Sequence, residues 1–397
     1  MNKKLAIIGL GYVGLPLGIL AVRAGYETIG IDLDSEKIKL LTRKISPIED
    51  ISNEQISQLI ENELFSLTSD FKKIQSANII LICVPTPLGI DRRPDISLLK
   101  SALTSIAGHL NKGSLLILES TVAPGTTRNT LASIILQNSN LEMSDFEVAF
   151  SPERIDPLNT SWNVENTPKL VAGLTQNALE NAVQFYSKFV RNIVKCDSLE
   201  IAETAKLLEN SFRLINISFI NEFSILCSKL GIDVIKVISA ASTKPYGYMP
   251  FYPSVGIGGH CIPVDPLYLA HKAQEVGAPS SFIHLADKIN QQMPGYFVNR
   301  AIELIDDLKG KKVLVVGVSY KPNVSDIRET PVEILIKNLK QKGAHVSWHD
   351  DLVKEWKGEK SVALGSDYDL AILATPHDYL DLTKLGNVPL INTRGSI

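Results

Sequence analysis

A glycine pattern near the N-terminus constrains the fold more than any other feature of the chain. Residues 5–8 read as a buried strand, and residues 15–24 read as a helix. Glycines between such elements permit a tight turn, close approach of a pyrophosphate and close packing of helix on strand, while the helix N-terminus presents N–H groups to the anion. The turn residues expected to contact a dinucleotide are Gly9, Gly11, Tyr12, Val13 and Gly14.

An acidic residue after the next strand specifies the dinucleotide further. Residues 28–31 supply that strand, and Asp32 follows it. In dinucleotide-binding folds, a carboxylate about 20 residues beyond the glycines binds the ribose hydroxyls. Because a carboxylate repels the 2′-phosphate of NADP, the sequence predicts NAD as the cofactor. Lys37 is also expected at this site, and its positive charge works against that preference.

Three further runs, residues 78–84, 114–119 and 147–150, read as strands separated by helical stretches. This alternation predicts a doubly wound parallel sheet. Ligands of open α/β sheets bind beyond the carboxyl ends of the strands. In the loops there, Thr86 and Thr121 suit either cofactor contacts or ordinary turns, and the sequence leaves both open.

The loop after the third of these strands carries Glu153 beside Arg154. A carboxylate at the mouth of such a sheet can activate a water molecule by accepting its proton. We therefore expect Glu153 to serve in a hydrolytic step.

Apolar residues recur at helical spacing from about Leu199 to Leu230, without Pro or Gly, which predicts one long helix that joins two domains. On it, Lys206 and Asn210 are four residues apart and share a face. They suit two roles, donors to a developing oxyanion or a pair of solvated polar residues.

The segment around Cys261 carries the strongest chemical signal in the second half of the chain. Gly258 and Gly259 precede the thiol closely and Asp265 follows it. Glycines that admit a substrate to the backbone, together with a nearby carboxylate, indicate an activated nucleophile. A structural cysteine in a loop rich in Gly and Pro is the alternative, and this segment alone does not decide between them.

A second α/β alternation begins after Asn299 and predicts another Rossmann-like sheet. Its first turn lacks the glycine pattern, so no second dinucleotide is expected there. Lys321, Asp326 and Arg328 gather near that turn and suit either a diphosphate site or an ordinary charged loop. The strands are expected at residues 312–316, 345–348, 370–374 and 390–392, with a helix at 330–340.

Composition excludes several classes of partner. Forty basic residues against forty-three acidic ones give a net charge of −3, without the basic excess typical of binding to nucleic acid or to an anionic membrane. No run reaches the roughly 18 apolar residues of a membrane span. The four cysteines are widely spaced and form no CxxC pair, which predicts neither a zinc site nor a disulfide framework and favours the cytoplasm.

These motifs resemble those of the UDP-glucose/GDP-mannose dehydrogenase family. They occur in the same order as in the family and extend along nearly the whole chain. Residues 243–253, with His260 before the cysteine and residues 262–266 after it, look most like its UDP-N-acetylglucosamine 6-dehydrogenase branch. UDP-glucose enzymes instead show Ser before the cysteine and a Lys-Asp pair after it. The resembling segments are the glycine turn, residues 84–87, 120–122 and 151–154, Lys206 with Asn210, residues 258–261, and Tyr320-Lys321 with Arg328.

The resemblance implies oxidation of a sugar C6 alcohol to a carboxylate with two NAD per turnover, through a thiohemiacetal and a thioester on Cys261. It implies UDP-N-acetylglucosamine as substrate, for synthesis of a surface polysaccharide or glycan precursor. UDP-N-acetylmannosamine, UDP-N-acetylgalactosamine and UDP-glucose remain alternatives.

Residue roles follow from the same resemblance. Glu153 would assist thioester hydrolysis, Lys206 and Asn210 would stabilise the oxyanion, and Asp265 would act with water as a base. Arg328 would reach the cofactor when the domains close, and the long helix would form a homodimer. Substrate contacts would come from Glu153, Arg154, Lys206, Asn210, Tyr252, Gly258 and Lys321.

The expected domains are an NAD-binding Rossmann domain at 1–190, a central helical domain with the cysteine loop at 191–298, and a Rossmann-like UDP-sugar domain at 299–397. Two other functions compete with this interpretation. A hydroxyacid dehydrogenase would use Asp32 and the glycine turn without needing Cys261. A module that senses NAD would bind it and produce no NADH.

Overall fold

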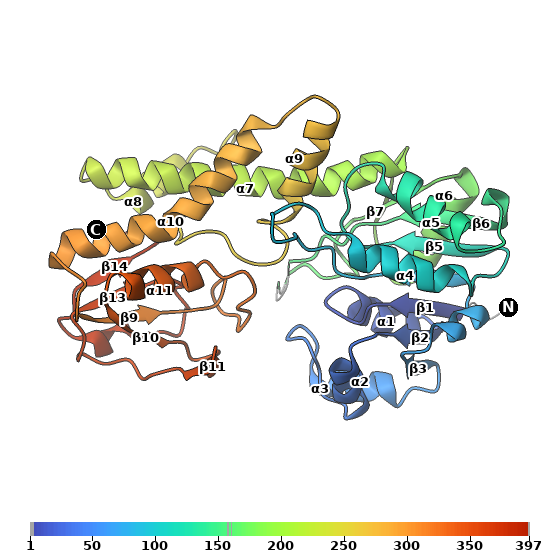
Figure 1. Cartoon of the computed structure of the whole chain (residues 1–397), viewed down its shortest axis with the longest axis horizontal. Helices are drawn as coiled ribbons and strands as arrows, with labels where there is room; N and C mark the ends of the chain where they lie inside the picture. Colours follow the sequence, from blue (N-terminus) through green and yellow to red (C-terminus); the bar gives the residue numbers. More distant parts are fainter. Residues whose placement is uncertain (1–3, 157–158, 160, 396–397) are drawn as a thin grey trace. The chain divides into compact units, whose positions relative to one another are not determined.

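The computed structural model describes residues 4–156, 159 and 161–395. By its internal contacts the chain divides into two units, Met1–Leu208 and Glu209–Ile397. The division falls within α7 (Leu199–Lys229), a single helix of 31 residues that is drawn in light green in Figure 1.

An eight-stranded sheet forms the centre of the first unit, in the order β3-β2-β1-β4-β5-β6-β7-β8. The strands from β3 to β6 are parallel, whereas β7 runs antiparallel to β6 and pairs in parallel with β8. The strands are β1 (Lys4–Ile8), β2 (Glu27–Ile31), β3 (Phe65–Thr68), β4 (Ile79–Ile82), β5 (Ser114–Leu118), β6 (Phe146–Phe150), β7 (Lys169–Gly173) and β8 (Ile193–Lys195).

Helices cover both faces of this sheet, so the central strands are apolar throughout instead of alternating. In β1, Leu5 and Ile7 pack into the core that includes α1 and α6, while Ala6 and Ile8 pack into the core that includes α4 and α5. The helices are α1 (Gly14–Arg23), α2 (Ser35–Thr42), α3 (Asn53–Ile60), α4 (Ser97–Ala107), α5 (Ala132–Gln137) and α6 (Gln176–Tyr186), with short helical turns at Phe71–Ser76, Thr127–Leu131 and Met143–Asp145.

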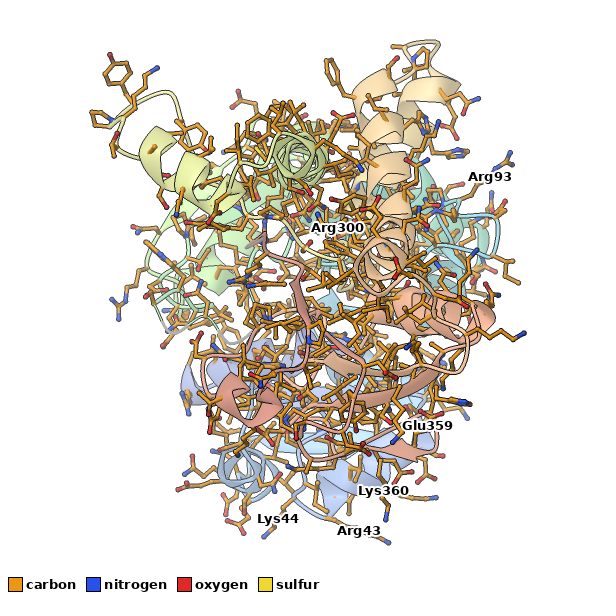
Figure 2. The ribbon with its side chains drawn as sticks, turned by 90° about the vertical axis from the view of Figure 1, so that its left-hand side faces the viewer. Arg43, Lys44, Arg93, Arg300, Glu359 and Lys360 are labelled. Carbon is orange, nitrogen blue, oxygen red and sulfur yellow. The ribbon has the colours of Figure 1, made fainter. Side chains whose placement is uncertain are left out.

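Helices dominate the first part of the second unit, which contains the later half of α7, α8 (Val234–Ala241), α9 (Asp265–Glu275) and α10 (Ser281–Ile305). Polar contacts fix α10 against α7. Ser218 Oγ donates to the carbonyl of Ala286 at 2.8 Å, and Arg300, labelled in Figure 2, donates to the hydroxyl of Ser228.

A four-stranded parallel sheet completes the second unit, in the order β10-β9-β13-β14. The apolar faces of α10 and α11 pack into one core on this sheet. The elements are β9 (Lys312–Val316), α11 (Val332–Gln341), β10 (His345–His349), β13 (Leu370–Leu373), a turn of helix at Leu382–Leu385 and β14 (Leu390–Asn392), with a small hairpin of β11 (Glu355–Trp356) and β12 (Glu359–Lys360).

The fold confirms the expected class, two Rossmann-like parallel sheets with a central helical region and one long helix. One detail differs from the expectation of a parallel sheet. The sheet of the first unit includes one antiparallel pairing, between β6 and β7.

None of the helices within residues 4–156, 159 and 161–395 combines the length and the apolar character that crossing a membrane requires.

Candidate active site

Backbone geometry explains the three glycines of the N-terminal turn. Gly9 has φ +94°, and a Cβ there would lie 2.7 Å from the carbonyl oxygen of Cys83. A Cβ on Gly14 would lie 1.9 Å from the carbonyl oxygen of Gly9, whereas one on Gly11 would face open space. The first and third glycines are therefore required by packing, and the middle one leaves room beside the backbone.

The start of α1 lies at this open space. No side chain caps the helix and its first turn holds no acidic residue, so its positive end remains available to an anion. Tyr12 and Val13, both half-buried, complete the turn. The open position at Gly11 and the uncapped helix together fit the pyrophosphate of a dinucleotide.

Asp32 lies at the carboxyl end of β2 and is 9% exposed. Its Oδ2 accepts hydrogen bonds from the backbone N–H of Leu10 at 2.8 Å and from Lys37 Nζ at 2.7 Å. The carboxylate is thus fixed beside the glycine turn, where it fits a ribose diol. Lys37 is paired with Asp32, which weakens its attraction for a 2′-phosphate.

The loops after β4 and β5 are tied together by their hydroxyls. Thr86 Oγ1 donates to the carbonyl of Thr121 at 2.7 Å, and Ser120 Oγ donates to the carbonyl of Val84 at 2.6 Å. Thr86 and Thr121 therefore meet at the carboxyl edge of the sheet, where a cofactor of this fold lies.

Sequence reasoning missed Glu203, a fully buried residue of α7. Its carboxylate accepts the backbone N–H groups of Gly125 at 2.6 Å and Thr127 at 2.9 Å. Burial raises the pKa of Glu203, against the lowering effect of those hydrogen bonds. The Glu203 side chain therefore holds the loop that follows Thr121. No motif in the sequence indicates this contact.

Glu153 is half-buried after β6, near a charged cluster that the sequence analysis did not anticipate. Lys169 Nζ lies 3.7 Å from Glu153 Oε2 and 2.9 Å from Glu119 Oε2. Lys169 is the first residue of β7, and Arg154 reaches the residue before it: Arg154 Nη1 donates to the carbonyl of Pro168 at 2.7 Å. Residues before and within β7 thus support the loop that carries Glu153.

The glycines before Cys261 allow other parts of the protein to approach. A Cβ on Gly258 would lie 2.7 Å from the carbonyl oxygen of Glu329, and one on Gly259 would lie 2.9 Å from the ring of Tyr320. The N–H of Gly259 also donates to the carbonyl of Arg328 at 3.1 Å. The expectation that these glycines admit a substrate needs correction at both positions, because protein atoms fill the space.

Cys261 lies about one turn before α9, and its side chain is exposed. Its carbonyl accepts the N–H groups of Val264 at 3.2 Å and Asp265 at 2.8 Å, which fixes its backbone relative to the start of the helix. The positive end of a helix favours negative charge nearby. Cys83, Cys196 and Cys227 are half-buried or buried, and all four cysteines are outside disulfides.

Asn210 and Asp265 form a buried pair beside this loop. Asn210 Nδ2 donates to Asp265 Oδ2 at 2.6 Å, and the two residues are 6% and 3% exposed. Lys206, one turn earlier on α7, is 7% exposed. The alternative of two solvated polar residues at 206 and 210 is therefore wrong.

Arg328, Lys321 and Tyr252 belong to the second unit as well. The Arg328 guanidinium forms a two-pronged contact with Asp326, in which Nε lies 2.9 Å from Oδ1. The carbonyl of Lys321 accepts from Ser319 Oγ at 3.0 Å, and Tyr252 is 48% exposed.

The turn after β9 repeats the local geometry of the N-terminal turn without its glycine motif. Gly317 has φ +80°, and the N–H of Val318 donates to Asp350 Oδ2 at 2.9 Å, as Leu10 does to Asp32. Here His377 Nε2 lies 3.1 Å from Asp350 Oδ2, and both side chains are fully buried. The Asp350 carboxylate is thus closed off by His377.

Comparison with known proteins gives matches along nearly the whole chain. Three domain models of the UDP-glucose/GDP-mannose dehydrogenase family match it, the NAD binding domain at residues 3–190, the central domain at 200–292 and the UDP binding domain at 314–392. Protein CapL from Staphylococcus aureus is 35% identical, over 97% of this chain and 92% of its own length.

Two other similar proteins carry names that specify a sugar. UDP-N-acetyl-D-glucosamine 6-dehydrogenase from Salmonella typhi is 32% identical, over 94% of this chain and 90% of its own length. The solved structure of UDP-D-ManNAc dehydrogenase from Pyrococcus horikoshii has a TM-score of 0.90 and 29% identity, over 99% of this chain and 95% of that one.

Proposed function

The chain belongs to the UDP-glucose/GDP-mannose dehydrogenase family, and from that premise we propose that it oxidises UDP-N-acetylglucosamine at C6 to UDP-N-acetylglucosaminuronate. It is an NAD-dependent oxidoreductase with a UDP binding domain. The observation that carries the proposed reaction is the exposed residue Cys261, whose carbonyl accepts the N–H of Asp265, the residue that pairs with Asn210 in a buried hydrogen bond.

The choice of sugar rests on two kinds of support. Residues 243–253 and the residues around the cysteine resemble the UDP-N-acetylglucosamine branch. One relative is named for UDP-N-acetyl-D-glucosamine and another for UDP-D-ManNAc, both N-acetylated sugars. We propose the first of these as the preferred substrate, and its product as a precursor of a surface polysaccharide.

NAD, held by the glycine turn and Asp32, supplies the hydride acceptor for both oxidations. After the first oxidation Cys261 adds to the C6 aldehyde, and its sulfur bonds to carbon to give a thiohemiacetal. The second oxidation leaves a thioester. Water then adds to the thioester carbonyl, the C–S bond breaks, and the sulfur returns as the thiolate while the sugar leaves as a carboxylate.

The remaining roles are distributed over the polar residues. Lys206 and Asn210 stabilise the oxyanion, and Asp265 acts with water as a base. Glu153 accepts a proton from the hydrolytic water. The substrate is bound by Arg154, Tyr252 and Lys321, and Arg328 contacts the cofactor.

The yield of NADH tests both the reaction and the sugar. With limiting UDP-N-acetylglucosamine we expect about two NADH per sugar, because a four-electron oxidation needs two hydride transfers. The same assay with UDP-N-acetylmannosamine, UDP-N-acetylgalactosamine and UDP-glucose ranks the substrates by kcat/KM. A ratio near one contradicts the reaction, and a clear preference for UDP-glucose contradicts the sugar assignment.

We also propose that a second copy of the chain covers an apolar stripe on α7. Leu208, Phe212, Phe219 and Leu226 repeat at helical spacing, and they are 63%, 46%, 60% and 52% exposed. Burying a side chain of this size contributes about 1.5–3 kcal/mol, so a paired stripe gains substantial stability. The resemblance to the family supports a homodimer through this helix.

Replacing Phe219 by Glu is expected to convert the dimer to a monomer, because a charged side chain at the centre of an apolar interface is desolvated without a partner. Light scattering after size exclusion measures the mass. Arg213→Glu, at another exposed position of α7, is the matched control and should leave the dimer intact. A monomeric wild-type protein, or a dimeric Phe219→Glu variant, contradicts the proposed interface.

A further inference from the structure

A buried lysine lies between two glutamates in the first unit. Lys169, at the start of β7, is 5% exposed. Its Nζ lies 2.9 Å from Glu119 Oε2 and 3.7 Å from Glu153 Oε2. Because β7 runs antiparallel to β6, its first residue lies at the edge where β5 and β6 end, and these strands lead into the two glutamates. One ammonium group thus faces two carboxylates.

Glu119 anchors the lysine. It is 1% exposed, and the hydroxyl of Tyr186 donates to its Oε1. Burial raises the pKa of Glu119 to about 7, although Lys169 opposes this shift. Burial by itself lowers the pKa of Lys169, but Glu119 and Glu153 outweigh that effect and raise it. The lysine therefore stays charged at neutral pH.

Each carboxylate oxygen of Glu153 faces a hydrogen-bond donor or a positive charge. Its Oε1 accepts the backbone N–H groups of Arg154 at 2.6 Å and Ile155 at 2.9 Å. Its Oε2 faces Lys169. Donors on one oxygen and a cation near the other fix the rotation of the carboxylate.

We propose that Lys169, anchored by Glu119, is a positioning residue that orients Glu153 as the proton acceptor for thioester hydrolysis. The inference rests on the proposed function, in which Glu153 takes a proton from water while the water oxygen bonds to the thioester carbon and Cys261 leaves. Lys169 touches none of the reacting atoms. Its effect on the reaction passes through the orientation of Glu153.

The test is Lys169→Met, which keeps a long apolar side chain and removes the charge. Rapid mixing with NAD and UDP-N-acetylglucosamine separates the NADH burst from steady turnover. We expect the burst to persist and turnover to fall about 10²-fold, the cost of misplacing a catalytic group by about 1 Å. Mass spectrometry of the quenched enzyme should show the sugar adduct accumulating on Cys261.

Two further variants and a measurement of NAD affinity serve as controls for Lys169→Met. Lys169→Arg retains a cation that can bridge two carboxylates and should restore most of the turnover. Tyr186→Phe removes the phenolic hydrogen bond to Glu119 and removes no charge, so turnover should stay within about fivefold of wild type, the factor that corresponds to about 1 kcal/mol. Unchanged affinity for NAD shows that the first unit is intact, and Lys169→Gln replaces Lys169→Met if that affinity is lost.

Glu153→Gln separates this inference from the proposed function. If Glu153→Gln accumulates the adduct and Lys169→Met does not, the role of Lys169 is overturned while the role of Glu153 stands. If neither variant accumulates it, Glu153 is not the hydrolytic group, and the proposed function fails at that step together with the inference. Adduct in both variants, with recovery in Lys169→Arg, supports the inference.

Discussion

Replacing Cys261 by serine is expected to abolish release of the uronate, with turnover lower by at least about 10³-fold. Removing a covalent nucleophile has cost up to about 10⁶-fold in kcat in a serine protease. A hydroxyl is a far weaker nucleophile than a thiolate at neutral pH, so the aldehyde cannot be captured efficiently. Formation of NADH and of the sugar carboxylate are measured together.

The other cysteines provide the controls for this experiment. Cys196 is half-buried and has no role in the proposed reaction, so Cys196→Ser should retain wild-type turnover. Burial raises the pKa of Cys83 well above its ordinary value, with the charge of Glu119 adding to the effect, so this thiol resists ionisation. Iodoacetamide should therefore label Cys261 first and inactivate the enzyme in proportion. Full turnover by Cys261→Ser would falsify covalent catalysis and favour a hydroxyacid dehydrogenase.

The parts of the site that follow a local pattern were predictable from the sequence. The glycine turn and Asp32 belong to a continuous strand-turn-helix-strand unit, so their spacing determines their geometry. Asn210 was recognised as a candidate because helical periodicity places it with Lys206 on one face of a long helix. Its partner Asp265 lies 55 residues further along the chain, and no local pattern indicates that pairing.

The groups that support the site were missed because their roles depend on contacts distant in sequence. Lys169 reads as an ordinary residue before an apolar run, and only the reversed direction of β7 brings it to Glu153. The reason for Gly258 was also misassigned. From the sequence, a glycine beside a nucleophile indicates space for a ligand, whereas here the carbonyl of Glu329 and the side chain of Tyr320 occupy that space.

Asp265 could act in the structure, by stabilising the start of α9, or in the chemistry, as a base, and the two roles predict different effects of its replacement. It is 3% exposed at the first position of α9, and Asn210 Nδ2 donates to it at 2.6 Å. A carboxylate at a helix N-terminus contributes about 0.3–1 kcal/mol to stability, and a hydrogen bond to a charged group about 1.5–3 kcal/mol. A purely structural residue would therefore show its loss mainly in the free energy of unfolding.

Replacing Asp265 by Asn is expected to lower kcat by about 10²–10⁴-fold, the contribution typical of a general base. The amide oxygen of the new side chain can still accept from Asn210, so the free energy of unfolding should fall by no more than about 3 kcal/mol. Urea denaturation and steady-state kinetics measure the two effects separately. Asn210→Ala is the matched control for stability alone, since it breaks the same hydrogen bond and keeps the carboxylate, while its turnover should fall through loss of an oxyanion donor. If both variants lose stability equally and Asp265→Asn keeps its turnover, Asp265 only anchors the cysteine loop and the base must be another group.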